Sequence, residues 1–422
     1  MKEVSIIGAT FYGNRGAEAM LCTTICELDS RFEQPCQFHV YSYYPEKDVS
    51  LVDRPNVRIF SCEPLYLVAV LIPCALLHRL FSLINANRLA SVLPQSVKAL
   101  ARSDIMICLA GVSFVDGRAK FLPFNICTLL PAILLDVPVV KFSQALGPFE
   151  RFFNRIMAGQ VLKRCARVFT RGERTHRHIE DLLSRQSNYQ RADDTVFLFR
   201  PSYCLSKSMI TLSEKLLKLK SCKPKDALLI GVCPSAVVAQ RARAQGWDYP
   251  QRIANIIEVL SDQGHRVSLY PNATRDGEIK KTHNNDLPLL DDIEERLSKK
   301  SRSNTIVFTG PLNASQIYEV IQCCDLHVTS RFHAMIAALG CGIPVMVIGW
   351  SHKYLEVLQE FNQQDMVIDY QQGSMTETLA LLDQLQSTRE TRRLQIVKGL
   401  SKVRASSKEQ FDFAESIIRG AI

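Results

Sequence analysis

The sequence predicts an α/β protein of two doubly wound, Rossmann-like domains that face a cleft. Two observations lead to this prediction. Short apolar runs alternate with helical patterns along both halves of the chain, which is typical of parallel sheets covered by helices. The chain also has 422 residues, more than one ordinary hydrophobic core holds and enough for two domains of roughly 200 residues each.

The first strand is expected at residues 4–8, and it leads through a glycine-rich turn into a helix. The turn contains Gly13, Asn14 and Gly16. Backbone N–H groups at such a helix start can hold a polar or anionic group, and the glycines permit close approach. Glu18, in the first helical turn, is either a favourable partner of the helix dipole or a hydrogen-bond partner of a substrate.

The rest of the first half supplies further strands, expected at residues 38–43, 57–60, 104–110, 137–144 and 167–171. Two of these strands deliver polar residues at their carboxyl ends, namely Gln144 and Arg171. Arg171 is either an ordinary surface arginine or a residue of the cleft. Its place at a strand tip favours the cleft as much as the surface.

The second half is expected to contain strands at residues 227–232, 266–270, 305–308, 326–329 and 345–348. Asn272 follows the second of these strands, and Arg331 and His333 follow the fourth. Lys353 is expected near the end of the last strand. Ligands of such sheets bind at the carboxyl ends of the strands, so these side chains are predicted to share one sheet edge.

These elements divide the chain into three parts. Residues 1–205 and residues 226–385 are each expected to form a Rossmann-like domain. A polar, lysine-rich crossover is expected at residues 202–225. Residues 386–422 are expected to form helices that can return to the N-terminal domain.

Composition narrows the classes of function. The net charge of +9 suits an anionic small molecule or an acidic membrane surface. The basic residues are spread along the chain without an aromatic-rich cluster, so nucleic acid is not an expected partner. The 14 cysteines show no Cys-x-x-Cys pair, and we expect reduced thiols and no metal. Residues 1–4 pass directly into a core strand, so we expect no secretory signal and a cytoplasmic protein.

One uncharged apolar segment, residues 65–77, raises the question of a membrane. It is shorter than the roughly 20 residues of a spanning helix, and Pro73 is expected to interrupt it, so we expect no span. Two interpretations remain. The segment is either a buried or oligomer-forming helical hairpin, or an apolar patch that rests on the membrane interface beside Arg79 and Arg88.

The chain resembles the polysaccharide pyruvyl transferases over residues 4–369. The motifs that carry the resemblance are Gly13-Asn14-Arg15-Gly16, Gln144 with Gly147-Pro148, Arg171, Asp194, and Ser330-Arg331-Phe332-His333-Ala334 through Gly342-Ile343-Pro344 to Lys353. The C-terminal stretch is highly specific, whereas the N-terminal turn alone is a weak signal.

The resemblance implies a fold like that of GT-B glycosyltransferases and the transfer of the enolpyruvyl unit of phosphoenolpyruvate onto two hydroxyls of a sugar. It implies that His333 is the general acid and that Arg171, Arg331 and Lys353 bind the donor. Arginine and lysine suit its phosphate and carboxylate, so neither a metal nor a cofactor is required.

The acceptor side is expected to include the residues Gly13, Asn14, Gly16, Glu18, Gln144 and Asn272. Two departures from the family pattern fall there: Ala17 stands where many members have an acidic residue, and Asn272 where many have histidine. The acceptor sugar is therefore open.

The expected partners are phosphoenolpyruvate and a sugar acceptor that can be lipid-linked, with peripheral contact to the inner membrane face and homo-oligomer formation as further possibilities. Two alternatives stay open: a nucleotide-sugar glycosyltransferase of the same fold, and a catalytically silent sugar-binding homologue.

Overall fold

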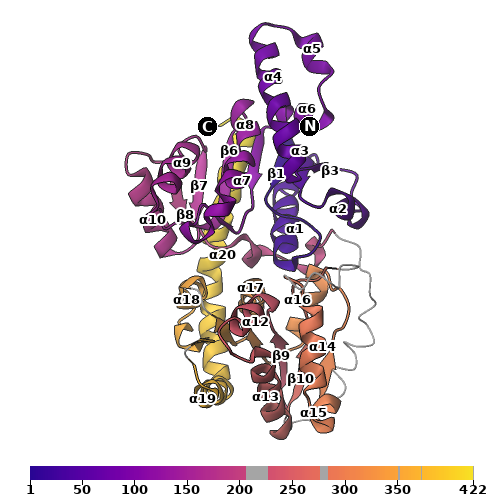
Figure 1. Cartoon of the computed structure of the whole chain (residues 1–422), viewed down its shortest axis with the longest axis vertical. Helices are drawn as coiled ribbons and strands as arrows, with labels where there is room; N and C mark the ends of the chain where they lie inside the picture. The colour runs from indigo at the N-terminus through magenta and orange to yellow at the C-terminus, as the bar shows by residue number, and fades with distance from the viewer. Residues whose placement is uncertain (206–226, 276–283, 350–351, 372, 422) are drawn as a thin grey trace. The chain divides into compact units, whose positions relative to one another are not determined.

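The computed structural model describes residues 1–205, 227–275, 284–349, 352–371 and 373–421 (Figure 1). Of the crossover predicted at residues 202–225, residues 206–225 lie outside the described residues. The chain forms two compact units. Unit 1 comprises Met1–Tyr12, Met20–Phe199 and Arg404–Ile422, and unit 2 comprises Gly13–Ala19 and Arg200–Val403. The glycine-rich turn thus belongs to unit 2, although it lies near the start of the chain.

Unit 1 is built on a parallel sheet in the order β3-β2-β1-β4-β6-β7-β8, with β5 beside β6. The strands are β1 (Glu3–Ile7), β2 (Gln37–Ser42), β3 (Val57–Ser61), β4 (Ile105–Cys108), β5 (Val112–Ser113), β6 (Val139–Leu146), β7 (Arg167–Thr170) and β8 (Tyr189–Arg191). The central strands are buried on both faces, including the polar residues Lys141, Ser143 and Gln144 of β6.

Helices cover both faces of this sheet, and Figure 1 shows α7 and α8 on one side and α20 on the other. The helices of unit 1 include α2 (Pro45–Leu51), α5 (Asn87–Ser91), α6 (Gln95–Arg102), α7 (Leu122–Cys127), α8 (Leu130–Leu134), α9 (Phe152–Leu162) and α10 (Glu173–Leu183). Arg31, just after α1 (Arg15–Asp29), pairs with Asp412 and Glu415 of α20 (Arg389–Arg419) at 2.6 and 2.9 Å. The last part of α20 therefore packs beside α1.

The apolar segment around Pro73 forms one continuous helix from Pro64 to Leu83, made of α3 (Pro64–Tyr66), a π-helical turn (Leu67–Leu71) and α4 (Ile72–Leu83). Pro73 does not interrupt it, so that expectation was wrong. The Ile72 N–H bonds the Leu67 carbonyl five residues back, and this wider turn accommodates proline at the start of α4. By length and composition alone, these 20 residues could cross a membrane.

Unit 2 is built on a parallel sheet in the order β11-β10-β9-β12-β13-β14. Its strands are β9 (Leu229–Cys233), β10 (Arg266–Leu269), β11 (Thr305–Val307), β12 (Leu326–Thr329), β13 (Val345–Gly349) and β14 (Val367–Asp369). All five strands predicted for this half are present. The order reverses between β9 and β12, and such a switch point is where ligands of open α/β sheets bind.

The helices of unit 2 are α12 (Ala236–Arg243), α13 (Tyr249–Asp262), α14 (Leu287–Glu295), α15 (Lys299–Asn304), α16 (Ala314–Gln322), α17 (Phe332–Gly340), α18 (His352–Gln359) and α19 (Met375–Ser387). Asn313 and Gln316 form a reciprocal capping box at the start of α16. Lys353 was expected near a strand end, but β13 ends at Gly349 and Lys353 is the second residue of α18.

Candidate active site

The candidate site lies in unit 2 at the carboxyl end of β12, where α17 begins. Thr329, the last residue of β12, donates its hydroxyl to the Cys233 carbonyl at 3.0 Å and accepts the Arg331 N–H at 2.9 Å. This ties the end of β12 to the end of β9 and directs the chain into α17. Arg331 is the N-cap residue and His333 the second residue of this helix.

The glycine-rich turn packs directly against this helix start. Gly13 accepts the Thr274 N–H at 2.9 Å and the Arg15 N–H donates to the Asn272 carbonyl at 3.1 Å, so the turn pairs with the segment after β10. A Cβ atom on Gly16 would lie 2.2 Å from two atoms of the His333 imidazole. The missing side chain of Gly16 is therefore what lets the His333 ring lie here.

Glu18 connects the glycine-rich turn to the rest of unit 2 through hydrogen bonds and an ion pair. Its carboxylate is fully buried, pairs with Arg15 at 2.9 Å and accepts the Ala314 N–H at 3.2 Å at the start of α16. Arg15 also donates to the Thr274 hydroxyl at 3.0 Å. Glu18 thus has a structural role at a helix N-terminus, and a hydrogen bond to an acceptor stays a prediction.

Arg331 has a buried carboxylate as its partner. Its guanidinium pairs with Asp286 and donates to the Asn284 side chain at 2.8 Å. Burial opposes the charge of Arg331, but the attraction of Asp286 prevails and raises the pKa of the guanidinium. The Asp286 carboxylate also accepts three backbone N–H groups, from Ala236, Asn272 and Ala273.

Asp286 therefore organises the loops after β9, β10 and β12 around one buried charge. Arg331 neutralises that charge, and Asn272 is held by its backbone with only 4% of its surface exposed. Donor binding by Arg331 and acceptor binding by Asn272 stay predictions, since each residue here contacts protein groups.

Lys353 reaches the same helix start from α18. Its ammonium lies 4.8 Å from the centre of the Phe332 ring, and that ring lies 5.3 Å from the His333 ring. The Tyr354 hydroxyl donates to the Ser330 carbonyl at 3.0 Å, and burial raises the pKa of Tyr354 to about 12. Arg331, His333 and Lys353, which the sequence placed at one sheet edge, therefore meet at the first turn of α17.

This arrangement suits an anion next to a proton donor. The first turn of α17 presents backbone N–H groups and the positive end of its dipole, and Lys353 adds a formal charge. His333 and Lys353 are both partly exposed, whereas Arg331 and Asp286 are buried. Of these four side chains, the histidine and the lysine are therefore the two that are not buried.

Unit 1 carries a second cluster of predicted residues. The Arg171 guanidinium pairs with Asp194 and donates to the Gly111 carbonyl at 3.0 Å, and its backbone N–H donates to the Gln144 carbonyl at 3.1 Å. The Gln144 side chain accepts the Ser113 hydroxyl at 2.6 Å. Gln144, Arg171 and Asp194 thus form one buried polar network at the carboxyl ends of β6 and β7.

With this geometry in place, comparison with known proteins identifies the family. Residues 14–352 match the family described as polysaccharide pyruvyl transferase. The chain belongs to this family. The resemblance drawn from the sequence is confirmed.

One relative of this chain is the amylovoran biosynthesis protein AmsJ of Erwinia amylovora. The two are 22% identical over 283 residues, which cover 66% of this chain and 64% of AmsJ. The chain therefore spans less than two thirds of the length of that relative.

Solved structures confirm the fold class of two doubly wound halves like those of GT-B proteins. A UDP-GlcNAc 2-epimerase from Neisseria meningitidis has a TM-score of 0.56 at 11% identity, covering 99% of this chain and all of that one. UGT89C1 of Arabidopsis thaliana has a TM-score of 0.57 at 12% identity, covering 99% of both chains. At these identities the likeness concerns the fold alone.

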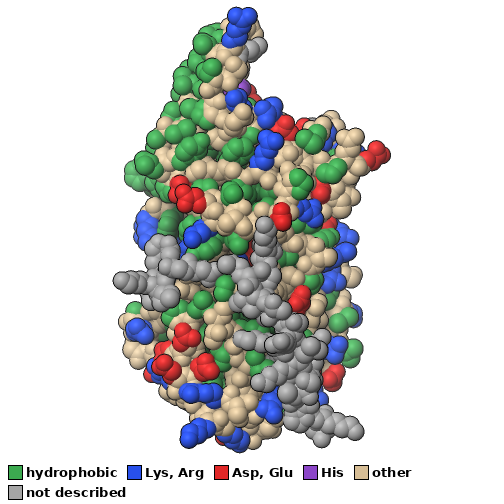
Figure 2. Space-filling model, turned by 90° about the vertical axis from the view of Figure 1, so that its right-hand side faces the viewer, with side chains coloured by type: hydrophobic (Ala, Val, Ile, Leu, Met, Phe, Trp, Pro, Cys, Tyr) green, Lys and Arg blue, Asp and Glu red, His purple; other side chains and the backbone are tan. Residues whose placement is uncertain are grey.

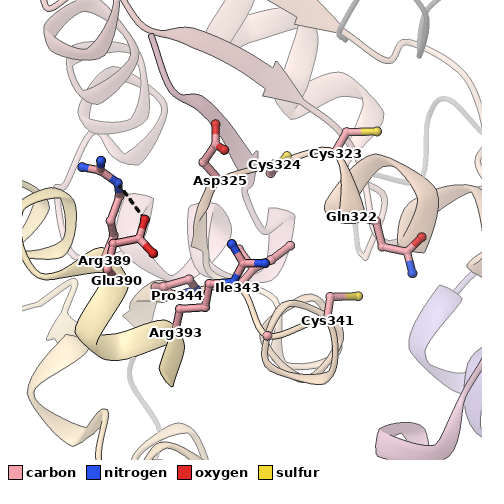
Figure 3. Close-up of a pocket in the computed structure, with 11 residues that line it drawn as sticks. Gln322, Cys323, Cys324, Asp325, Cys341, Ile343, Pro344, Arg389, Glu390 and Arg393 are labelled. Carbon is pink, nitrogen blue, oxygen red and sulfur yellow. Dashed lines mark ion pairs between the residues drawn. The ribbon is translucent and has the colours of Figure 1, made fainter. Parts of the chain in front are cut away.

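The chain also has a cavity of about 290 Å³ in unit 2, away from the cluster described above (Figure 3). It is lined by Asp325, which precedes β12, by Pro344, which precedes β13, and by Arg389 and Arg393 of α20. It therefore opens at the amino-terminal edge of the sheet. His333 lies past the carboxyl end of β12, so this cavity is not part of the candidate site.

Asp286 is the main site residue that the sequence did not reveal. It stands immediately before α14, where an aspartate usually indicates a helix cap. In the structure its side chain makes no capping bond and turns to Arg331 instead. The pairing joins residues 45 positions apart, and no local pattern signals it.

Proposed function

We propose that this protein transfers the enolpyruvyl unit of phosphoenolpyruvate onto two hydroxyls of a sugar in an exopolysaccharide or its lipid-linked precursor. The product is a cyclic pyruvate ketal, and phosphate is released. Family membership and the name of the relative AmsJ support polysaccharide biosynthesis. The observation that carries the proposal is the meeting of His333 and Lys353 at the first turn of α17.

In the proposed donor site, Lys353 and the N–H groups of the first turn of α17 bind the phosphate of phosphoenolpyruvate. Arg331 and Arg171 are the further proposed ligands of its anionic oxygens. Each arginine is paired with a buried carboxylate, Asp286 or Asp194, so it has to share or exchange that partner to bind the donor. Lys353 is partly exposed and lies over the Phe332 ring, and it is the primary cation of the proposal.

The proposed chemistry begins with a proton. Protonated His333 gives its proton to the methylene carbon of the donor, which makes the central carbon electrophilic. One sugar hydroxyl adds to this carbon and loses its proton, and the C–O bond to phosphate breaks. The neighbouring hydroxyl then adds to the same carbon and loses its proton, which closes the ketal ring. The bound cations stabilise the departing phosphate, so the mechanism needs no metal or cofactor.

The acceptor is proposed to contact the turn of Gly13, Asn14 and Gly16, because this turn packs on His333 within unit 2. Glu18, Gln144 and Asn272 remain proposed acceptor-side residues. We further propose that the reaction takes place in the cytoplasm, at the inner face of the membrane where lipid-linked sugars are built.

The test is to incubate the purified protein with phosphoenolpyruvate and a panel of nitrophenyl or lipid-linked sugars. Phosphate release and a pyruvyl mass increment on the sugar are measured together. We expect both to appear only when donor and acceptor are present. Release of a nucleotide from a nucleotide sugar, with no phosphate from phosphoenolpyruvate, would instead identify a glycosyltransferase, and binding of sugar without either product would identify a silent homologue.

A further inference from the structure

Unit 1 exposes a concentrated apolar surface that the proposed chemistry does not use. Twenty large hydrophobic side chains are exposed in the described part of the chain; nine lie in residues 65–92 and five in residues 121–157. Figure 2 shows hydrophobic side chains gathered along the upper part of the molecule, where Figure 1 shows α4 and α5 projecting. We call these fourteen side chains the apolar face. Such a concentration is typical of a surface that binds a partner or a membrane.

The helices that carry the apolar face are neighbours on one side of the sheet of unit 1. α4 packs against α8, and α7 contacts both α8 and α9. Right-handed crossovers between the parallel strands place all these connections on the face opposite α1. Phe152 and Phe153 of α9, which are 71% and 75% exposed, therefore belong to the same side as the projecting α4 and α5.

Charge on this side is mostly positive. Residues 64–103, 117–135 and 151–172 contain none of the 42 acidic residues of the chain. The same stretches hold exposed basic residues, among them Arg88, Arg102, Arg118, Lys120, Arg151 and Arg155. A second copy of the chain would bring a face of the same charge and be repelled, whereas an anionic lipid surface is complementary to both the apolar and the basic side chains.

The helix from Pro64 to Leu83 packs one of its stripes on unit 1. Leu67, Leu71 and Ala75 are buried, and the two leucines belong to the hydrophobic core of unit 1. The opposite stripe is open, and the tip beyond it exposes Leu83 and Ile84 at 67% and 70%. A helix with one stripe packed on protein and one stripe open is suited to lie on the interface.

We propose that the apolar face docks unit 1 onto a bilayer that contains anionic lipid, with the α4–α5 tip and the start of α9 inserted at the headgroup level. The basic residues around them contact the lipid phosphates. This inference rests on the surface of unit 1 and does not depend on the proposed reaction.

The test is co-sedimentation of the full chain with vesicles of phosphatidylcholine alone and of phosphatidylcholine with phosphatidylglycerol. Two double variants remove exposed apolar groups: Leu83→Gln with Ile84→Gln at the tip, and Phe152→Gln with Phe153→Gln on α9. A control pair, Leu394→Gln with Val397→Gln, changes side chains on α20 that are 72% and 55% exposed but lie outside the apolar face.

The unchanged chain and the control pair are expected to bind the anionic vesicles, and each test pair is expected to lower the partition coefficient at least about tenfold. Binding should weaken in high salt and on neutral vesicles. Phosphate release on a water-soluble acceptor should stay the same in all variants, which separates this test from that of the reaction. Equal binding of all variants, or no binding by the unchanged chain, would overturn the proposal. So would a dimer that both test pairs dissolve, because the face would then join two copies.

Discussion

The contact between Gly16 and His333 gives the sharpest prediction about geometry. Gly16→Ala places a methyl group 2.2 Å from the imidazole, and ordinary contact begins at 3.4 Å. The ring therefore has to withdraw by at least 1.2 Å, the difference between these distances. A misplacement of about 1 Å can lower a catalytic rate roughly 100-fold, so phosphate release should fall by about this factor. Overpacking should also lower the free energy of unfolding by about 1–3 kcal/mol.

The assay is the initial rate of phosphate release from phosphoenolpyruvate, measured together with the thermal unfolding of the same sample. Gly340→Ala is a matched control, since Gly340 ends the helix that carries His333 and a Cβ atom there meets nothing within 4 Å. The control should keep both rate and stability. A Gly16→Ala protein that is folded and releases phosphate at the unchanged rate would refute the reasoning.

Three further predictions concern charged and titratable groups of unit 2. Lys353→Gln should raise the KM for phosphoenolpyruvate about tenfold or more through loss of a charge-assisted hydrogen bond, with little change in melting temperature. Lys402→Gln, at an exposed lysine of α20, is the control. An unchanged KM in Lys353→Gln would contradict the role of Lys353. Arg331→Ala leaves the Asp286 carboxylate buried without its cation. The free energy of unfolding, measured with urea, should therefore fall by roughly 3–5 kcal/mol. A fall of less than about 1 kcal/mol would argue against the buried pair. Burial lowers the pKa of His327 from 6.5 to about 3. Below pH 6.5, His327 therefore binds a proton in the unfolded chain but not in the folded chain. Stability should therefore fall by roughly 2 kcal/mol between pH 6.5 and 4.5, and His327→Gln should flatten this slope; parallel pH curves for the two proteins would contradict it.

The strands and the sheet edge could be predicted because their signals are local. Strands β9 and β13 follow from continuous apolar runs, and β10, β11 and β12 from short runs that also contain polar residues. Parallel strands bring the residues after β12 and β13 to a common edge. Arg331, His333 and Lys353 could therefore be placed together from the amino-acid sequence alone. The fold class follows from the alternation of strands and helices along the whole chain.

What the sequence could not reveal depends on pairing between distant residues. Asp286 pairs with Arg331 across 45 positions, and Gly16 packs on His333 across an even longer separation. No periodicity in the amino-acid sequence indicates such contacts. The prediction that Pro73 interrupts the helix was wrong for a different reason. A single π-helical turn accommodates the proline within a continuous helix, and no residue pattern here predicts that turn.

The most direct test of the central claim compares His333→Ala with His352→Ala in the phosphoenolpyruvate-dependent reaction. His352, on α18, has a side chain that is 43% exposed, so its loss controls for removing an imidazole near the site. The account predicts that His352→Ala keeps phosphate release and that His333→Ala lowers it roughly 100-fold or more while phosphoenolpyruvate still binds. Full phosphate release by folded His333→Ala would contradict the assignment of His333 as the proton donor.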